Sequence, residues 1–361
     1  MTPTPLPVQP PVAPMLAKPV RELPLGDDLI YEPKWDGFRC VVFRDGDQLE
    51  LASRSERPLT RYFPELGAPL RAALPESCVV DGEVVIAGPG GLDFDALLQR
   101  IHPAESRVDR LAQATPASLV AFDLLALGER DLRPLPFAER RQLLESCLRS
   151  AHPQVRITPA TTDPELARDW FQRFEGAGLD GVIAKRPGLP YQEGQRVMFK
   201  LKHQRTADCV VGGFRWHVDG QGVGSLLLGL YSGEGRLQHV GITSSFTTER
   251  RRQLVAELEP HLLGEGAAHP WVDPLTAVPG NRRPGTPSRW TAKRDLSFVA
   301  LQPRLVCEVA YDHLQGDRFR HGTTFRRWRP ERDPSTCTYD QLETTVPAEL
   351  AELFPEPSLP Q

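Results

Sequence analysis

Short apolar runs rich in β-branched and aromatic residues, each bounded by turn residues, recur along this chain and favour a fold dominated by antiparallel strands. In the first half, two segments with helical spacing of apolar residues, 137–150 and 163–177, interrupt these runs, which predicts an α+β fold. The apolar run 118–127 predicts a buried strand, and 77–87 predicts two strands around a turn at Asp81–Gly82. The expected strands lie within 29–52, 77–87, 118–127, 179–186 and 196–203.

The spacing of the strands changes after Thr206. Five short β runs separated by glycine-rich turns, with one helix near 247–259, predict a small barrel of the OB type. The segment 261–289 is rich in Gly, Pro and Arg and predicts a long surface loop. The predicted organisation is a disordered proline-rich tail (1–13), an antiparallel-sheet domain (14–205), an OB-fold domain (206–345) and a C-terminal tail (346–361).

Composition excludes several classes of protein. A chain of 361 residues with 40% hydrophobic and 25% charged residues is typical of two globular domains. It contains no run of 18 apolar residues that would predict a membrane span, and its N-terminus lacks the features of a signal peptide. Its six cysteines include no C-x-x-C pair, which argues against a structural zinc site and favours a reducing cytoplasm.

Positive charge is concentrated near the C-terminus, although the net charge is −4. Between Arg282 and Arg332 there are 12 Arg or Lys residues against 5 Asp or Glu, a local charge of +7. A basic surface on an otherwise acidic chain is typical of nucleic-acid binding, and a solvated arginine-rich face is the alternative.

Lysine is rare in this chain, with 6 lysines against 37 arginines. A lysine can lose its proton and become a nucleophile, whereas an arginine cannot, so each lysine is a candidate for chemistry. Four of the six lie in three short motifs, a fourth motif holds two carboxylates, and a fifth is an apolar strand. In chain order these are Glu32-Pro33-Lys34-Trp35-Asp36-Gly37-Phe38-Arg39, Asp81-Gly82-Glu83, the strand containing Phe122, Asp180-Gly181-Val182-Ile183-Ala184-Lys185 and Phe199-Lys200-Leu201-Lys202.

In this order and spacing, the motifs resemble those of the nucleotidyltransferase superfamily, and in particular the stand-alone bacterial C-type ATP-dependent DNA ligases. The resemblance extends from Pro14-Met15-Leu16-Ala17 to about Asp340, and it includes the ending GDRFRHGTTFRRWRPERDP. It implies an adenylation domain followed by an OB-fold domain, with ATP, a divalent cation (Mg²⁺ or Mn²⁺) and nicked duplex DNA as the molecules that the chain binds.

The chemistry of nick sealing agrees with a lysine nucleophile. A neutral amine can attack the α-phosphorus of ATP, expel pyrophosphate and hold AMP as a phosphoramidate. The nearby charges of Lys200, Lys202 and the divalent cation would favour the neutral amine of Lys34 and offset charge on the α-phosphate.

The resemblance implies a role for each matching residue. Lys34 is the residue that receives AMP, Glu32 and Phe122 form the adenine site, and Lys200 and Lys202 contact phosphate. The other implied nucleotide contacts are Arg39, Arg54, Glu83, Lys185 and Arg196, and the implied metal ligands are Asp36, Glu83 and Asp180. In the C-terminal part, Arg329 and Arg332 orient the departing pyrophosphate, and Arg320, Arg326 and Arg327 share that task or grip DNA. In the first domain, Arg54 also contacts the DNA at the nick.

Some of these positions admit a second interpretation. Phe122 fits a core position, and Lys185 fits a solvated strand end. Asp180 stands where many relatives carry glutamate, so a bridging water could replace direct metal coordination. Arg332 stands where relatives often carry lysine, and a guanidinium binds phosphate equally well.

Two rival functions share part of this pattern. An RNA ligase or a GTP-using capping enzyme would use the same lysine chemistry, and a non-catalytic OB-fold protein would need only basic and aromatic surfaces. The combined motifs favour a DNA ligase that acts as a monomer in repair, such as base excision repair beside a gap-filling polymerase. Because the C-terminal arginines must serve both ATP and DNA, we expect a hinge near His203–Ala207.

Overall fold

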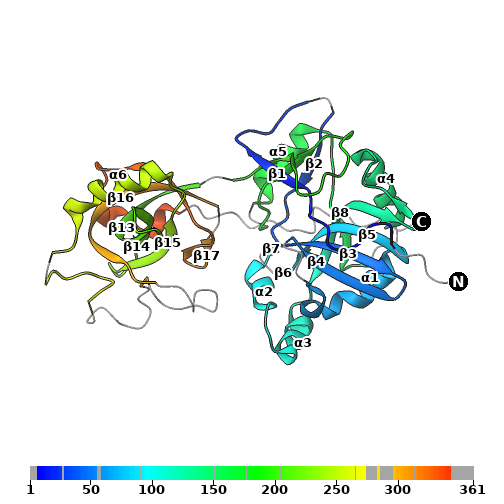
Figure 1. The fold of residues 1–361 in the computed structure, drawn as a ribbon, viewed down its shortest axis with the longest axis horizontal. Coiled ribbons are helices and arrows are strands. Elements are labelled where there is room, and N and C mark those ends of the chain that lie inside the picture. The colour runs from blue at the N-terminus through cyan, green and yellow to red at the C-terminus, as the bar shows by residue number, and fades with distance from the viewer. Residues whose placement is uncertain are drawn as a thin grey trace. The chain divides into compact units, whose positions relative to one another are not determined.

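The computed structural model divides the chain into two compact units (Figure 1). Among the described residues, the first unit ends at His203 and the second begins at Arg205; the sequence prediction put this boundary between 205 and 206. The described residues are 6–26, 28–54, 58–88, 91–148, 152–175, 177–203, 205–264, 266–273, 283–284, 296–312 and 314–342. The predicted C-terminal tail, 346–361, lies outside them.

Two main sheets form the first unit. The smaller has the order β1-β12-β11-β2, in which β1 runs parallel to β12 and the other pairs are antiparallel. Its strands are β1 (Leu16–Val20), β12 (Arg196–Leu201), β11 (Val182–Lys185) and β2 (Ile30–Pro33). The larger has the order β10-β8-β5-β3-β4, and β9 (Arg130–Asp131) pairs with β8. Its strands are β10 (Val155–Ile157), β8 (Ser118–Leu127), β5 (Ser77–Val85), β3 (Phe38–Asp45) and β4 (Gln48–Ser53).

Short elements connect and cover these strands. The helices are α1 (Gly67–Ala73), α2 (Phe94–Gln99), α3 (Glu105–Ala114), α4 (Phe137–Cys147) and α5 (Pro164–Arg173), with 3₁₀ turns at Thr60–Tyr62 and Pro64–Leu66. A two-stranded ribbon joins β6 (Ala87–Gly88) to β7 (Gly91–Leu92). Helix α5 begins where the sequence predicts, because Asp163 accepts the amide hydrogen of Glu165 at 2.8 Å and Pro164 opens the first turn.

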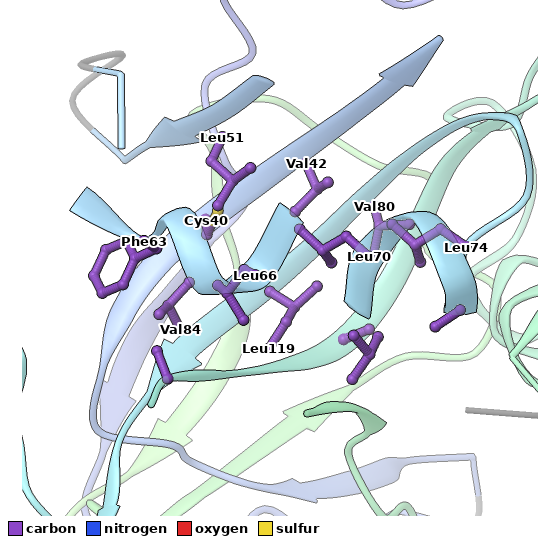
Figure 2. Packing of buried hydrophobic residues seen from close by; sticks show 14 of the residues in the cluster. Cys40, Val42, Leu51, Phe63, Leu66, Leu70, Leu74, Val80, Val84 and Leu119 are labelled. Carbon is purple, nitrogen blue, oxygen red and sulfur yellow. The ribbon is translucent and has the colours of Figure 1, made fainter. Parts of the chain in front are cut away.

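The larger sheet is buried on both faces. Along β3, Cys40 and Val42 pack with Leu66 and Leu70 on one face (Figure 2), whereas the alternate residue Val41 packs in a second cluster on the other. Successive side chains of a strand point to opposite faces, so a continuous apolar run is what a doubly covered strand requires.

The N-terminal segment supplies part of the second cover. Leu6, Val8 and Val12 are only 7%, 1% and 2% exposed, and they pack with Val41 and Met198. The prediction of a disordered tail over 1–13 is therefore wrong for residues 6–13, because these apolar side chains alternate with prolines and bury against the sheet; residues 1–5 lie outside the description.

The prediction of two strands around a turn over 77–87 is also wrong. Residues Ser77–Val85 form one continuous strand, and Asp81–Gly82 is not a turn. Glycine is needed here because the backbone of β8 lies very close to β5: a Cβ on Gly82 would lie 2.7 Å from the carbonyl oxygen of Val120. A β-bulge in the β5–β8 pairing falls between Asp81 and Gly82.

The second unit is built on a five-stranded antiparallel sheet with the order β15-β14-β13-β16-β19. Its strands are β15 (Leu237–Thr243), β14 (Val223–Tyr231), β13 (Arg205–Trp216), β16 (Val299–Tyr311) and β19 (Thr324–Trp328), with the helix α6 (Thr248–Leu258). The two edges approach at one point, where the Thr323 amide donates to the Ile242 carbonyl at 2.9 Å. The sheet thus curls toward a barrel, although the described strands do not close it by continuous pairing.

Smaller elements complete the second unit. A ribbon pairs β17 (Leu314–Gln315) with β18 (Arg318–Phe319), and 3₁₀ turns occupy Glu259–His261, Pro334–Thr336 and Tyr339–Gln341. Part of the expected surface loop over 261–289 is instead core: Trp271 is 3% exposed, and its Nε1 donates to the Leu237 carbonyl at 2.8 Å. Gly212 and Gly229 leave the space that its ring fills.

Two compositional expectations have structural counterparts. All six cysteines are free thiols. Within the described ranges, no helix combines the length and apolar character that crossing a bilayer would require.

Candidate active site

A cavity of about 300 Å³ lies in the first unit, between residues of both sheets. Nine of the residues singled out from the sequence line it, and they come from six separate segments of the chain. They are Glu32, Lys34, Arg39, Arg54, Glu83, Phe122, Lys185, Arg196 and Lys200. Sequence reasoning did not select Trp35 or the Pro14–Ala17 segment, which also line it.

Backbone contacts bring three of the motifs together around Lys34. The Lys34 amide donates to the Gly181 carbonyl at 2.8 Å, and the Asp180 amide donates to the Lys34 carbonyl at 2.9 Å. Gly181 has a φ of +131°, and a Cβ there would lie 2.0 Å from the Leu201 carbonyl oxygen. Only glycine lets the segment after β2, the start of β11 and the end of β12 approach this closely.

Asp180 places one carboxylate between two ammonium groups. It forms an ion pair with Lys34, and its Oδ2 lies 3.1 Å from Nζ of Lys202. The Asp180 side chain is 7% exposed, so the carboxylate is shielded from water. Lys200 stands beside this cluster, where burial, followed by the positive charges of Lys202 and Lys34, lowers its pKa. The site therefore gathers a net positive charge suited to phosphate.

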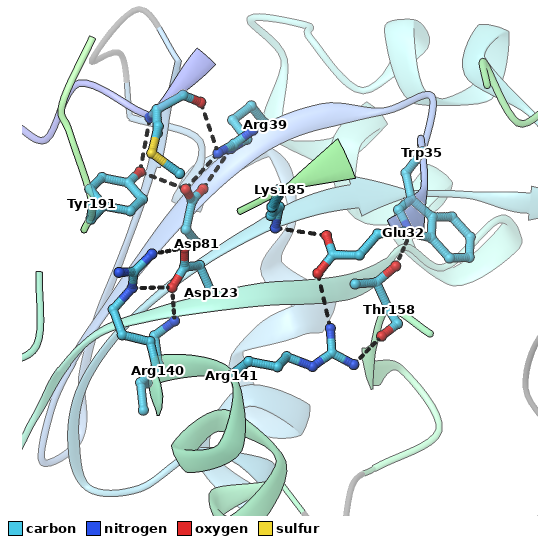
Figure 3. Close-up of polar contacts among 12 residues, drawn as sticks. Glu32, Trp35, Arg39, Asp81, Asp123, Arg140, Arg141, Thr158, Lys185 and Tyr191 are labelled. Carbon is cyan, nitrogen blue, oxygen red and sulfur yellow. Dashed lines mark hydrogen bonds and ion pairs between the residues drawn. The ribbon is translucent and has the colours of Figure 1, made fainter. Parts of the chain in front are cut away.

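Glu32 is a buried carboxylate held by two cations (Figure 3). Nζ of Lys185 lies 2.7 Å from its Oε2, and Nη1 of Arg141 lies 3.1 Å from its Oε1. Lys185 is itself 3% exposed, so the alternative of a solvated strand-end lysine is wrong. Its ammonium also lies 5.0 Å from the centre of the Phe122 ring, on the cavity wall.

Arg39 is fixed from behind by a buried network. Its Nε and Nη2 donate to the two oxygens of Asp81, each at 2.6 Å. The Tyr191 hydroxyl donates to Asp81 at 2.6 Å and accepts the Met15 amide hydrogen at 3.1 Å. The Arg39 guanidinium in turn lies 4.4 Å from the Phe122 ring centre. Phe122 is half-buried with one side on the cavity, so it is not solely a core residue.

Of the three carboxylates expected to bind metal, Glu83 lines the cavity. Burial raises the pKa of Glu83 to about 7, while the positive charges of Arg39 and Lys34 oppose that rise. Asp36 is close enough to raise it further, but it does not line the cavity. Within the described part of the chain, no three His, Cys, Asp or Glu side chains converge on a preformed metal centre. The arrangement fits Mg²⁺, which is commonly held by one or two carboxylates together with substrate phosphates.

The C-terminal arginines lie in the second unit and do not line the cavity. Arg329 forms ion pairs with Asp208 at 3.0 Å, Glu331 at 2.5 Å and Glu308 at 3.4 Å. Arg332 approaches Asp208 at 3.6 Å, and the exposed Arg327 pairs with Glu308 at 2.8 Å. Arg320 is half-buried and Arg326 is exposed in the same unit. The roles assigned to these five arginines stay predictions.

Sequence reasoning missed Arg141, Asp81 and Tyr191 as parts of the site. Helix α4 carried a signal for the first, because Arg140 and Arg141 follow Phe137 by three and four positions and precede Leu144 on its apolar face. A buried arginine must be paired, and here Arg140 binds Asp123 while Arg141 binds Glu32 (Figure 3).

Comparisons with known proteins identify the family of this chain. Residues 14–202 match the family model "ATP dependent DNA ligase domain", and residues 219–332 match "ATP dependent DNA ligase C terminal region". The chain is 55% identical to DNA ligase C of Mycobacterium tuberculosis, over 97% of this chain and 99% of that protein. It is 54% identical to DNA ligase C2 of Mycolicibacterium smegmatis, over 94% of this chain and 96% of that protein.

A solved structure from a study of Lig E DNA ligases has a TM-score of 0.54 at 16% identity, covers 88% of this chain and 99% of that one, and supports the fold alone. The two family models, together with relatives that match over nearly their whole length, show that this chain belongs to the ATP-dependent DNA ligases and is similar among them to the stand-alone C-type enzymes.

Proposed function

We propose that this ligase seals a 5′-phosphate to a 3′-hydroxyl in nicked duplex DNA by passing AMP through Lys34. The observation that carries the proposal is the position of Lys34 on a cavity wall shared with Glu32, Phe122 and Lys200, beside the buried Asp180. A nucleophile, cations for phosphate and an aromatic ring for a base thus surround one space large enough for a nucleotide.

The first step makes a lysine–AMP bond. Lys34 must leave its ion pair with Asp180 and pass a proton to solvent water, which reaches its partly exposed side chain, because an ammonium has no electron pair to donate. Its Nζ then attacks the α-phosphorus, a P–N bond forms, and the bond to pyrophosphate breaks. Lys200 and Lys202 offset charge on the phosphate oxygens. Asp180 and Glu83 are the residues that would hold a divalent cation, which would supply further charge neutralisation.

Two later transfers use the same cavity. The 5′-phosphate at the nick takes AMP from Lys34, and the 3′-hydroxyl then displaces AMP to form the phosphodiester. The nucleotide and the nick are contacted by four cations, which are Arg39, Arg54, Lys185 and Arg196. Asp36 contributes to the metal site. In the first step, pyrophosphate is oriented by Arg329 and Arg332. Arg320, Arg326 and Arg327 provide cations for the DNA backbone. We infer that the enzyme acts as a monomer in the cytoplasm, in DNA repair beside a gap-filling polymerase.

Intact mass after incubation with ATP and Mg²⁺ tests the first step. The wild-type chain should gain one AMP, and Lys34→Arg should gain none while keeping its fold by circular dichroism. Lys18→Arg is the matched control, because Lys18 lies in β1 outside the cavity lining, and it should be charged normally. Peptide mapping that placed AMP on Lys185 or Lys200 would contradict the assignment, and sealing assays on DNA and RNA nicks would separate the two ligase classes.

A further inference from the structure

Arg141 links the two sheets at one end of the cavity. Its Nη1 contacts Glu32 of β2 in the smaller sheet, and its Nη2 donates to the Thr158 carbonyl at 2.6 Å. The Thr158 amide in turn donates to the carbonyl of Ala121 at 2.9 Å, in β8 of the larger sheet. Ala121 immediately precedes Phe122, so a short chain of hydrogen bonds joins Glu32 to the strand that carries the aromatic ring.

The second branch of this network reaches the nucleophile. Trp35 donates its Nε1 hydrogen to Oγ1 of Thr158 at 2.8 Å, and Trp35 is the residue after Lys34 (Figure 3). Both groups at this junction are buried, with Thr158 at 1% and Arg141 at 7% exposure. The guanidinium is further held at its Nε by Glu145 at 2.6 Å. A planar group bound at three of its nitrogens has little freedom to move.

Glu32 would remain paired without Arg141, because Lys185 contacts its other oxygen. A single ammonium on a flexible stem restrains a carboxylate less than an ammonium and a guanidinium on opposite oxygens. Arg141 is therefore not needed to neutralise Glu32; its particular contribution is to fix where the carboxylate points.

Direction matters because adenine and guanine differ in what they present to a carboxylate. Adenine offers the N6 amino donor where guanine offers the O6 acceptor, and a carboxylate can only accept. A fixed Glu32 would bind the adenine edge and repel guanine O6. A carboxylate free to turn could instead accept hydrogen bonds from N1–H and the N2 amino group of guanine, and selectivity would fall.

We propose that Arg141 is a positioning residue that fixes Glu32 relative to Phe122 and thereby makes the cavity select ATP over GTP. The proposal rests on the proposed function, in which Glu32 and Phe122 form the adenine site. It assigns the role to a residue of α4 that has no direct part in the chemistry.

The test is the ratio of kcat/KM for self-nucleotidylation with ATP and with GTP, because this ratio does not depend on the folded fraction of the enzyme. Arg141→Gln should lower the ATP:GTP ratio by about 10- to 100-fold, the effect of a misplacement near 1 Å. Arg141→Lys keeps a positive charge and gives a folded alternative, and it should lower the ratio less. Glu32→Gln should lower it at least as much as Arg141→Gln, since an amide offers guanine O6 a donor.

Arg100→Gln is the matched control. Arg100 is a fully buried arginine of the same unit, paired with Glu65 at 2.6 Å and absent from the cavity lining. Its loss should destabilise the unit and leave the ATP:GTP ratio unchanged.

The possible results distinguish a failure of the positioning role of Arg141 from a failure of the proposed ligase function. A wild-type enzyme that takes no AMP on Lys34 would refute the proposed function and the positioning role together. Normal charging of the wild type, with a wild-type ratio in both Arg141 variants, would overturn the positioning role alone. An equal fall in Arg100→Gln would also overturn it, because the effect would then come from general loosening of the unit.

Discussion

Replacing Gly181 by alanine should push apart the backbone segments that bring Lys34, Lys200 and Lys202 together. A Cβ at this position would lie 2.0 Å from the carbonyl oxygen of Leu201 and 3.1 Å from Cα of Lys202, whereas ordinary contacts begin near 3.4 Å. Both atoms belong to backbone, so the end of β12 must retreat by about 1 Å or more. That movement shifts Lys200 and Lys202 away from Lys34.

The magnitude has two parts. A φ of +131° costs an L-residue roughly 1–3 kcal/mol, and overpacking against backbone adds about 1–3 kcal/mol. A total near 4 kcal/mol lowers the Tm of a unit of this size by about 8–16 °C. A displacement of about 1 Å at Lys200 and Lys202, the lysines proposed to contact phosphate, should slow formation of the AMP adduct roughly 100-fold.

Gly46→Ala is the control that separates the cost of the positive φ from the cost of overpacking. Gly46 has a φ of +59° in the β3–β4 turn, and a Cβ there meets nothing within 4 Å. This variant should lose only about 1–2 kcal/mol from its backbone conformation and should form the adduct at the wild-type rate. Thermal unfolding and a time course of intact mass, both well below the Tm, provide the measurements. Wild-type adduct kinetics in Gly181→Ala would refute the close-approach argument.

Three further predictions concern charge and domain movement. Arg329→Ala should slow self-adenylylation about 10²–10³-fold and still seal a nick that already carries 5′-AMP; normal charging with impaired sealing would favour a DNA-gripping role instead. Burial raises the pKa of Glu83 from 4.5 to about 7, so its protonated form stabilises the fold below pH 4.5, and that contribution is lost as pH rises through 7. The free energy of unfolding of Glu83→Gln should therefore depend less on pH between 4.5 and 7 than that of the wild type. Parallel curves for the two proteins would argue against the raised pKa. Solution scattering should differ among ATP-free, adenylylated and nick-bound enzyme if the chain bends near His203–Ala207, and identical profiles in all three states would exclude that hinge.

Much of the fold can be predicted from local pattern. Period-2 alternation and turn residues locate most strands, and Asp163–Pro164 locates the start of α5, because these signals act within a few residues of the chain. The scarcity of lysine makes each lysine a candidate, and the resemblance carried by the short motifs implies that Lys34 receives AMP. The structure places Lys34 on the cavity wall, and its reaction with ATP stays a prediction.

Local pattern fails where one residue type serves two structural purposes. Asp81–Gly82 has the composition of a turn, yet its glycine admits the backbone of a neighbouring strand. The segment 6–13 has the composition of a disordered tail, yet it covers part of the second face of the larger sheet. In both cases the deciding partner lies elsewhere in the chain, so no local window contains the signal.

The motif order and the two-domain division can be predicted from the sequence itself, because each depends on residue type and spacing, and the lysine chemistry is what the resemblance carried by those motifs implies. Only the tertiary structure decided how the charges pair: Glu32 meets Arg141 across 109 positions, and Arg39 meets Asp81 across 42. Ion pairs depend on distance in space and on burial, and neither can be read from a list of charged residues. The contact between Arg141 of α4 and Glu32 could therefore be found only in the tertiary structure.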